Sequence, residues 1–411
     1  MKINKHCFPN GLRLVHYEDT STQMVALNIV YDVGARDEHP EHTGFAHLFE
    51  HLMFGGSAHI PDNDTPLQLA GGENNAWTNN DITNYYLTVP KPNVETAFWL
   101  ESDRMLELAF SEQSLEVQRG VVMEEFKQRC LNQPYGDVGH LFRPLAFRVH
   151  PYRWPTIGKE LSHIEQATLD EVKSFFYRFY APNNAVLAVT GNISWDETVK
   201  LTEKWFAPIP RRNVPVRQLP QEPEQTQERR LTVERNVPLD ALFMGYHMCS
   251  REGADYYAFD ILSDILSNGR SSRLNRRLVQ EQNIFSGIDA YISGTRDAGL
   301  LQISGKPAAG VSLEQAEAAV RKELEELQRS PVDGQELEKV KNKFESTQIF
   351  GNINYLNVAT NLAWFELTGK AEDIDLEVER YRSVTTEQLH TVAQRTFCES
   401  NAVVLYYKSD K

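Results

Sequence analysis

One stretch near the middle of the chain is unlike the rest of it. From Pro208 to Arg230 the sequence reads PIPRRNVPVRQLPQEPEQTQERR, which holds five of the 19 prolines and almost no large apolar residues. This composition is typical of a linker. Because single hydrophobic cores stop growing at roughly 250–300 residues, a chain of 411 residues should have more than one. We therefore predict two domains, residues 1–207 and 231–411, joined by a linker at 208–230.

The two predicted domains resemble each other near their ends. The segment NAVLAV at residues 184–189 corresponds to NAVVLY at residues 401–406. Each follows a stretch of helix-forming residues with an N-cap signal, Thr168 in the first domain and Thr385 in the second. The chain thus carries an internal repeat, which predicts two similar domains that arose by duplication.

A third pair of segments supports the repeat and indicates the fold class. HLFEHLMFGG at residues 47–56 aligns with ILSDILSNGR at residues 261–270, with isoleucines where the first copy has histidines. Segments with strand-like alternation, residues 26–32 and 84–89, flank the first of these helices. Strands that come in neighbouring pairs favour antiparallel pairing. We predict an α+β fold in which each domain is a mostly antiparallel sheet with helices packed on it.

The charge of the chain argues against nucleic acid and anionic lipid as partners. The formal net charge is −15, and the sequence contains no long cluster of lysine and arginine. Binding to phosphate-rich surfaces requires such a cluster. A basic or neutral substrate fits the acidic balance better.

The N-terminus and the cysteines indicate an expected location. The first residues, MKINKH, lack the apolar stretch of a secretory signal, and no run approaches the roughly 20 apolar residues of a membrane span. We expect a cytoplasmic protein that does not enter a membrane. The four cysteines, Cys7, Cys130, Cys249 and Cys398, are scattered singly. They are predicted to be small buried residues, neither disulfide partners nor thiolate metal ligands.

The pentapeptide HLFEH at residues 47–51 is the most informative motif in the chain. Residues four apart lie on one face of a helix, so His47 and His51 can converge on one metal ion. Glu50 projects beside that face, where it can take a proton from a water molecule. Thr43 is a candidate N-cap and Gly55-Gly56 a candidate helix end. The motif has the H-x-x-E-H pattern of inverted zincins, and the alternative is a helix with two ordinary histidines.

A catalytic zinc takes three protein ligands and keeps one position open, so a third ligand must come from elsewhere. The segment EVQRGVVMEEFK at residues 116–127 has a helical pattern with two adjacent glutamates. Glu125 lies on one stripe with Gln118 and Val122, whereas Glu124 lies on a different face. A carboxylate beside apolar residues would be costly to bury without compensation, which a metal would supply. From this pattern alone, the reading of both glutamates as surface charges stays open.

The chain resembles the pitrilysin superfamily, which includes insulin-degrading enzyme, the mitochondrial processing peptidase and two-domain bacterial peptidases. The resemblance covers most of the first half, in the family's order, and the second half more loosely. The matching stretches are GARDEHPEHTGFAHLFEHLMFGGS (34–57), GGENNAWTNNDITNYYLTVP (71–90), EVQRGVVMEEFKQR (116–129), HPYRWPTIGKELSHI (150–164) and FYAPNNAVLAVTGNI (179–193).

This resemblance implies a zinc (Zn2+) metallopeptidase and assigns roles to four residues. It implies that His47, His51 and Glu125 bind the metal and that Glu50 is the general base. Imidazole and carboxylate ligands at a hydrolytic centre also favour zinc over manganese or cobalt.

The same resemblance implies a substrate-binding strand. In the family, an extended peptide substrate adds to the edge strand that corresponds here to Asn75, Ala76 and Thr78. The alternative is that Asn75 and Thr78 are plain turn and strand residues.

Two departures from the family pattern bear on activity. Gln118 stands where the family commonly has a glutamate behind the metal ligands, so this position can hydrogen-bond but brings no charge. After Ser272-Arg273-Leu274, active relatives have an arginine and a tyrosine that hold the substrate, and here Val279 and Ser286 occupy those positions. Losing such a stabiliser costs a few kcal/mol, which is serious for a chain acting alone.

Nearby residues could replace the missing pair only if the local register differs from that of the family. Arg276, Arg277 and Tyr291 are the closest candidates in sequence, and we interpret them as two surface charges and a core aromatic residue.

We therefore expect a zinc endopeptidase that cleaves peptides or unfolded segments. It would work as a homodimer, or as a heterodimer with a related chain that supplies the arginine and tyrosine. Two other functions are compatible with the sequence: a non-catalytic assembly subunit of the same fold, and a metal-dependent peptide-binding module without turnover. The presence of His47, Glu50, His51 and Glu125 argues for the enzyme.

Overall fold

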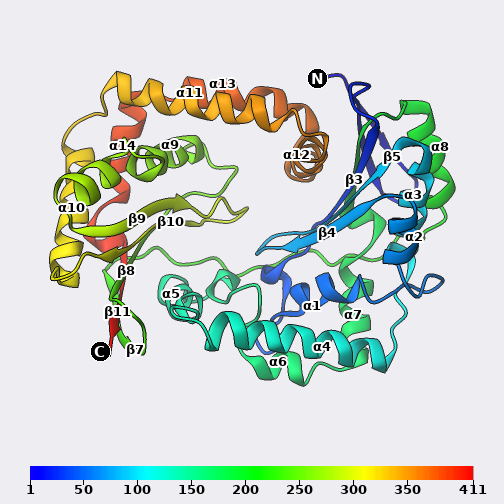
Figure 1. The fold of residues 1–411 in the computed structure, drawn as a ribbon, viewed down its shortest axis with the longest axis horizontal. Coiled ribbons are helices and arrows are strands. Elements are labelled where there is room, and N and C mark those ends of the chain that lie inside the picture. Colours follow the sequence, from blue (N-terminus) through cyan, green and yellow to red (C-terminus); the bar gives the residue numbers. More distant parts are fainter. Residues whose placement is uncertain (411) are drawn as a thin grey trace. The chain divides into compact units, whose positions relative to one another are not determined.

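The computed structural model describes residues 1–410, in two compact units. The first unit comprises Met1–Leu131, Trp154–Pro220 and Ile349–Leu376, and the second comprises Asn132–Arg153, Gln221–Gln348 and Glu377–Lys411. Each unit has its own sheet and its own helices (Figure 1). The predicted α+β fold with two similar domains is confirmed.

The sheet of the first unit has six strands in the order β1-β2-β6-β3-β5-β4. Neighbouring strands are antiparallel except for the β2 and β6 pair, so the sheet is mixed. The strands are β1 (Ile3–Cys7), β2 (Arg13–Glu18), β3 (Met24–Tyr31), β4 (Glu73–Thr78), β5 (Thr83–Pro90) and β6 (Ala185–Gly191). The helices of this unit are α1 (Phe45–Leu52), α2 (Asp64–Leu69), α3 (Val94–Leu106), α4 (Glu112–Phe126), α6 (Leu161–Glu165), α7 (Leu169–Phe179), α8 (Trp195–Trp205) and α12 (Tyr355–Thr368).

The second unit repeats this arrangement with five strands in the order β7-β11-β8-β10-β9. Its only parallel pair among the described residues is β7 with β11, the counterpart of β2 with β6. The strands are β7 (Arg229–Arg235), β8 (Ala241–His247), β9 (Phe285–Ile292), β10 (Leu300–Pro307) and β11 (Ala402–Ser409). Its helices are α5 (Val138–Ala146), α9 (Tyr256–Ser267), α10 (Leu313–Arg329), most of α11 (Gly334–Gly351), α13 (Glu377–Ser383) and α14 (Thr386–Thr396).

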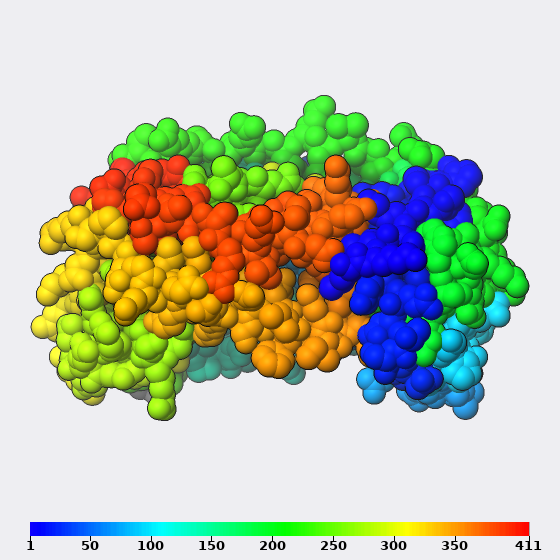
Figure 2. Space-filling model, turned by 90° about the horizontal axis from the view of Figure 1, so that it is seen from above, coloured from blue at the N-terminus to red at the C-terminus, as the bar shows by residue number. Residues whose placement is uncertain are grey.

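Both faces of the first sheet are buried, because β3 alternates between two cores. Leu27, Ile29 and Tyr31 face the core that includes side chains of α1, α3 and α7. Ala26 and Val30 face a second core, made with α12. Figure 2 shows residues 355–368 in orange against the blue N-terminal strands. Such two-sided burial fixes the register of the strand, because a shift by one residue would exchange the two faces.

Each sheet is covered on one face by a helix that comes from the other half of the chain. α12, from the second half of the chain, packs on β3 and β6 of the first unit. Its counterpart α5, from the first half, packs on β7, β8 and β11 through side chains that include Phe142. The contact-based units therefore differ from the sequence-based domains: residues 132–153 join the second unit and residues 349–376 the first.

The segment predicted as a linker has no regular secondary structure over most of its length. Its first part is nevertheless held to the first unit by hydrogen bonds and an ion pair. The Arg212 guanidinium donates to the carbonyls of Tyr180 and Leu106. The Arg217 guanidinium pairs with Asp32 at 2.9 Å. Residues 210–228 contain no helix or strand, and β7 begins at Arg229.

Several local predictions can be compared directly with the structure. Thr168 caps α7 and Thr385 caps α14, as predicted, each by accepting a backbone N–H. All four cysteines are free, and Cys130 is buried as predicted. Cys249 and Cys398 are only half-buried, and the prediction is wrong for Cys7, which lies exposed on β1 at the edge of the sheet. Among residues 1–410, no helix is both long and apolar enough to cross a membrane.

Candidate active site

The helix α1 forms from FAHLFEHL and starts one residue later than predicted. Its N-cap is Gly44, at φ 90°, and the prediction of Thr43 as N-cap is wrong. The Thr43 hydroxyl instead accepts the N–H of Lys159 at 2.8 Å and contacts His163 Nδ1 at 2.8 Å. Tertiary contacts therefore override the local capping signal at this position.

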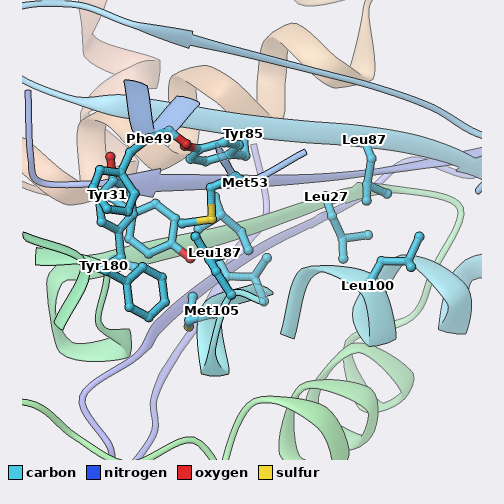
Figure 3. Packing of buried hydrophobic residues seen from close by; sticks show 14 of the residues in the cluster. Leu27, Tyr31, Phe49, Met53, Tyr85, Leu87, Leu100, Met105, Tyr180 and Leu187 are labelled. Carbon is cyan, nitrogen blue, oxygen red and sulfur yellow. The ribbon is translucent and has the colours of Figure 1, made fainter. Parts of the chain in front are cut away.

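The two faces of α1 have different tasks. Phe49 and Met53 point into the core among Tyr31, Tyr85 and Tyr180 (Figure 3). The Tyr85 hydroxyl donates to the carbonyl of Phe49 at 3.1 Å, which ties the helix to β5. The apolar face thus anchors α1, and the opposite face is left to carry chemistry.

His47 and His51 lie one turn apart on α1, as the motif predicts. Their ring centroids are 4.9 Å apart, and the ring planes are inclined at 84°. The side chain of His47 is 10% exposed and that of His51 23% exposed. Both rings therefore lie in a partly dry environment, which is accessible mainly on the side of His51.

The helix α4 brings Glu125 to the two imidazoles. Ser111 caps the helix by accepting the N–H of Ser114 at 3.0 Å, and a π-helical turn (Lys127–Leu131) follows Phe126. Glu124 points outward, with its side chain 64% exposed, and pairs with Lys127 at 2.6 Å. Of the two adjacent glutamates, Glu125 is the one that the structure brings to the histidines.

The three side chains meet at one point. Glu125 Oε2 lies 3.5 Å from His47 Nε2 and 3.3 Å from His51 Nε2. Tetrahedral zinc with ligand bonds of roughly 2.0–2.2 Å places neighbouring ligand atoms roughly 3.3–3.6 Å apart. Among residues 1–410, these are the only three or more His, Cys, Asp or Glu side chains whose ligand atoms cluster closely enough to hold a metal ion. The geometry of this donor set therefore fits zinc.

The charges of the three groups also fit a metal site. Burial lowers the pKa of His47 to about 4, so this ring is neutral at pH 7 and has a free lone pair. The neighbouring His51 is the largest influence on Glu125 and lowers the pKa of that carboxyl group. Neutral imidazole and ionised carboxylate are the forms that bind metals.

Glu50 lies between the two histidines in sequence and beside them on the helix. Burial raises the pKa of Glu50 above its ordinary value, and the neighbouring Thr78 hydroxyl opposes this shift. A general base works best when its pKa lies closer to the working pH than that of an ordinary glutamate. The environment of Glu50 therefore favours proton transfer.

Arg129 is a neighbour of the site for which no role was predicted. Its Nη2 atom lies 3.0 Å from Glu125 Oε1, on the oxygen that does not face the histidines. The signal was present, because Arg129 is four residues after Glu125 on the same helical stripe. This contact leaves one carboxylate oxygen of Glu125 directed at the imidazoles.

The predicted substrate strand is β4, at the edge of the first sheet. Asn75, Ala76 and Thr78 pair on their inner side with β5. The Ala76 N–H donates to the Asn75 side-chain oxygen at 2.8 Å. Thr78, at the end of the strand, lies next to Glu50. An extended chain along this edge would pass over the candidate base.

Gln118 does not reach the ligands. Among residues 1–410, no hydrogen bond joins its side chain to His47, His51 or Glu125, and the buried His47 Nδ1 has no hydrogen-bond partner. The amide nitrogen of Gln118 instead lies near Gly55, 3.7 Å from where a Cβ atom of that residue would be. The expected contact behind the ligands is therefore not formed in this structure.

The departures in the second half have structural explanations within the second unit. Val279 packs against the core, and the Ser286 hydroxyl donates to the carbonyl of Lys306 at 3.1 Å. Arg276 is exposed, in agreement with its interpretation as a surface charge, whereas Arg277 is half-buried and pairs with Glu323 at 2.6 Å. Tyr291 is 48% exposed on β9, so its interpretation as a core residue is wrong.

Comparison with known proteins identifies the family. Residues 13–137 match the family described as Insulinase (Peptidase family M16), and residues 166–344 match the family described as Peptidase M16 inactive domain. The first match contains all four candidate catalytic and metal-binding residues, and the second contains none of them.

Relatives of similar length support this assignment. The chain is 26% identical to the zinc protease PqqE of Helicobacter pylori, over 97% of this chain and 91% of that protein. It is 25% identical to the uncharacterised zinc protease YmxG of Bacillus subtilis, over 98% of each. A crystal structure of a Helicobacter pylori protease has a TM-score of 0.93 and covers 99% of both chains at 26% identity. The chain is a member of peptidase family M16, in the pitrilysin superfamily, whose curated relatives are named zinc proteases.

Proposed function

We propose that this chain is a zinc-dependent endopeptidase that hydrolyses peptides or unfolded segments. The observation that carries the proposal is the convergence of His47, His51 and Glu125 on one point. Glu50 stands beside that point with a raised pKa. Two imidazoles, one carboxylate and an adjacent free carboxylate make up the donor set and base of a hydrolytic zinc centre.

The residues of the chain divide the chemistry between them. When bound, zinc supplies Lewis acidity, which polarises the peptide carbonyl and makes water more acidic. His47, His51 and Glu125 would hold the ion. Glu50 would take the proton of the attacking water and pass it to the leaving amine.

The position of β4 supports strand addition as the mode of substrate binding. A peptide that pairs with the free edge at Ala76 would be held through its main chain, so sequence selectivity would come from side-chain pockets. The substrate would have to replace the contact between Asn75 and the Ala76 N–H. This mode suits extended or unfolded peptides better than folded proteins.

We further propose that the active form is a pair of chains. The candidate pair members are a second copy of this chain or a related chain that supplies an arginine and a tyrosine. The proposal is supported by Val279 and Ser286, which cannot stabilise developing negative charge as those residues do. A cytoplasmic location stays a prediction from sequence, and a similar fold with 19% identity and a TM-score of 0.81 is that of a periplasmic protease, PqqL of Escherichia coli.

The test is a metal analysis combined with a peptidase assay on the full chain. We expect one zinc per chain by elemental analysis, and hydrolysis of a quenched peptide that a chelator abolishes and added zinc restores. We expect weak activity from the chain alone and strong activity after mixing with a related chain that carries the arginine and tyrosine. The matched control is His47→Gln, which should remove both zinc and activity.

Other outcomes would identify the alternatives. A chain without zinc and without hydrolysis, alone or mixed, would indicate an assembly subunit. A chain that holds zinc and binds the peptide in every mixture but never cleaves it would indicate a binding module. Either result would contradict the proposed enzyme.

A further inference from the structure

Glu38 is a buried carboxyl group that the proposed chemistry does not use. Glu38 is only 6% exposed. Its Oε2 atom accepts the N–H of Gly44 at 2.9 Å, and its Oε1 atom accepts the N–H of Ala46 at 2.9 Å. Both amides lie at the start of α1, where backbone N–H groups have no partner within the helix. Glu38 therefore closes the end of the helix that carries the candidate ligands.

The helix α1 has no side chain of its own for this task. Its N-cap residue is Gly44, at φ 90°, and a Cβ atom there would lie 2.9 Å from the carbonyl oxygen of Ile157. Larger N-cap residues that could accept the amides are thus excluded by packing. Thr43, the preceding residue, uses its hydroxyl to hold the Lys159 N–H. An acceptor from outside the helix is required, and Glu38 supplies it.

Glu38 is itself held in place by the segment before it. A short 3-10 turn (Ala35–Asp37) precedes it, and the Trp154 indole N–H donates to the carbonyl of Ala35 at 2.9 Å. Arg36 pairs with the buried Asp81 at 3.2 Å. Burial raises the pKa of Glu38 to about 8, and its two backbone hydrogen bonds oppose this shift. The carboxyl group therefore has a fixed position from which to hold α1.

We propose that Glu38 is a positioning residue for the metal site, and that its two hydrogen bonds set the rotation of α1 at which His47 and His51 meet Glu125. α1 has eight residues, which is about two turns, and His47 directly follows Ala46. A small rotation of α1 therefore moves both imidazoles relative to Glu125. The expected fall in kcat rests on the proposed function, whereas the effect of Glu38 on the position of α1 does not.

The test is Glu38→Gln in the full chain. An amide group offers one acceptor oxygen, so one of the two backbone amides loses its partner while the size of the side chain is kept. We expect zinc affinity, measured by competition with a chromophoric chelator, to fall roughly 10–100-fold, as for other residues that orient metal ligands. We expect kcat to fall and KM to stay near its original value, because β4 is unchanged.

The matched control is Glu222→Gln in the second unit. The Glu222 carboxylate accepts the backbone N–H groups of Arg148, Val149 and His150 at 2.8–3.0 Å, and it belongs to the second unit, which contains none of the metal ligands. We expect both variants to lower the melting temperature and only Glu38→Gln to change zinc affinity. If Glu38→Gln kept its zinc affinity and kcat while its melting temperature fell like that of the control, Glu38 would be an ordinary stabilising residue and the proposal would be overturned.

A measurement on the unaltered chain covers the case in which Glu38→Gln does not fold. The first amides of a helix normally exchange quickly with water, because they lack partners. The proposal expects the amides of Gly44 and Ala46 to be protected in hydrogen exchange as strongly as the centre of α1. Rapid exchange there would overturn the role of Glu38, whereas a protected chain that binds no zinc would contradict only the proposed function.

Discussion

The helices α1 and α9 occupy equivalent places beside two sheets that share the order of five strands, yet they have different functions. α1 presents His47 and His51 on a partly exposed face, whereas the corresponding Ile261 and Ile265 of α9 are buried in the core of the second unit. Both helices keep an acidic residue between these positions, and burial raises the pKa of Asp264 in α9 as it does that of Glu50.

The comparison shows what the metal site adds to the shared scaffold. In the second unit the whole helix face is used for packing, and Asn268 donates to the Asp264 carboxylate at 2.7 Å. In the first unit, α4 places the carboxylate of Glu125, and not apolar side chains, against the histidine face of α1, so this face is not used for core packing. A raised pKa on a helical acid is therefore not by itself a sign of catalysis; the adjacent ligands are.

The largest effect is expected from Glu50→Gln. Removing the base should lower peptide hydrolysis roughly 10²–10⁴-fold, while elemental analysis still finds zinc, because Glu50 is not a ligand. Asp264→Asn, at the equivalent position of α9, is the matched control and should keep its activity. The comparison between α1 and α9 would break if both substitutions reduced hydrolysis equally, or if Glu50→Gln turned over substrate at the original rate.

The second effect is expected from Glu125→Gln, which removes the negative ligand but keeps its shape. We expect zinc affinity to fall by at least about 100-fold, because a neutral amide is a much weaker zinc ligand than a carboxylate. Chelator competition measures this directly. Unchanged zinc affinity in this variant would mean that the metal binds through other residues, and the assignment of α4 to the site would be withdrawn.

Local sequence signals predicted the parts of the structure that depend on neighbours in the chain. The caps at Thr168 and Thr385 and the pairing of His47 with His51 on one face follow from spacings of three or four residues. The repeat also pointed to two similar domains. These features need no knowledge of distant contacts.

Features that depend on distant contacts could not be predicted in this way. Nothing in residues 138–146 or 355–368 indicates which sheet the helix will cover, and each packs on the sheet of the other half of the repeat. The cap of α1 was assigned to Thr43, but packing around Gly44 and the distant Glu38 decides it. The choice of Glu125 over Glu124 needed the family resemblance, because both lie on one helix.

A third prediction tests the exchanged helices. Leu362 of α12 is fully buried against the first sheet, and Leu362→Ala should cost about 2–5 kcal/mol of unfolding free energy. Phe142→Ala in α5 should cost about 3–5 kcal/mol. Hydrogen exchange shows where each loss falls: in β3 and β6 for Leu362, and in β8 and β11 for Phe142. A loss in the opposite sheet would contradict the exchange.

The smallest effect is expected from Glu124→Gln, on the same helix as Glu125 and one position before it. Glu124 is exposed, and its side chain forms an ion pair with Lys127. Exposed pairs of this kind contribute about 0.2–1 kcal/mol, so stability should change little and zinc affinity not at all. Because the charge of α4 changes by the same amount as in Glu125→Gln, this variant separates ligand geometry from the general field of the helix. A fall in zinc affinity comparable to that of Glu125→Gln would show that total charge, and not the direction of one carboxylate, holds the metal.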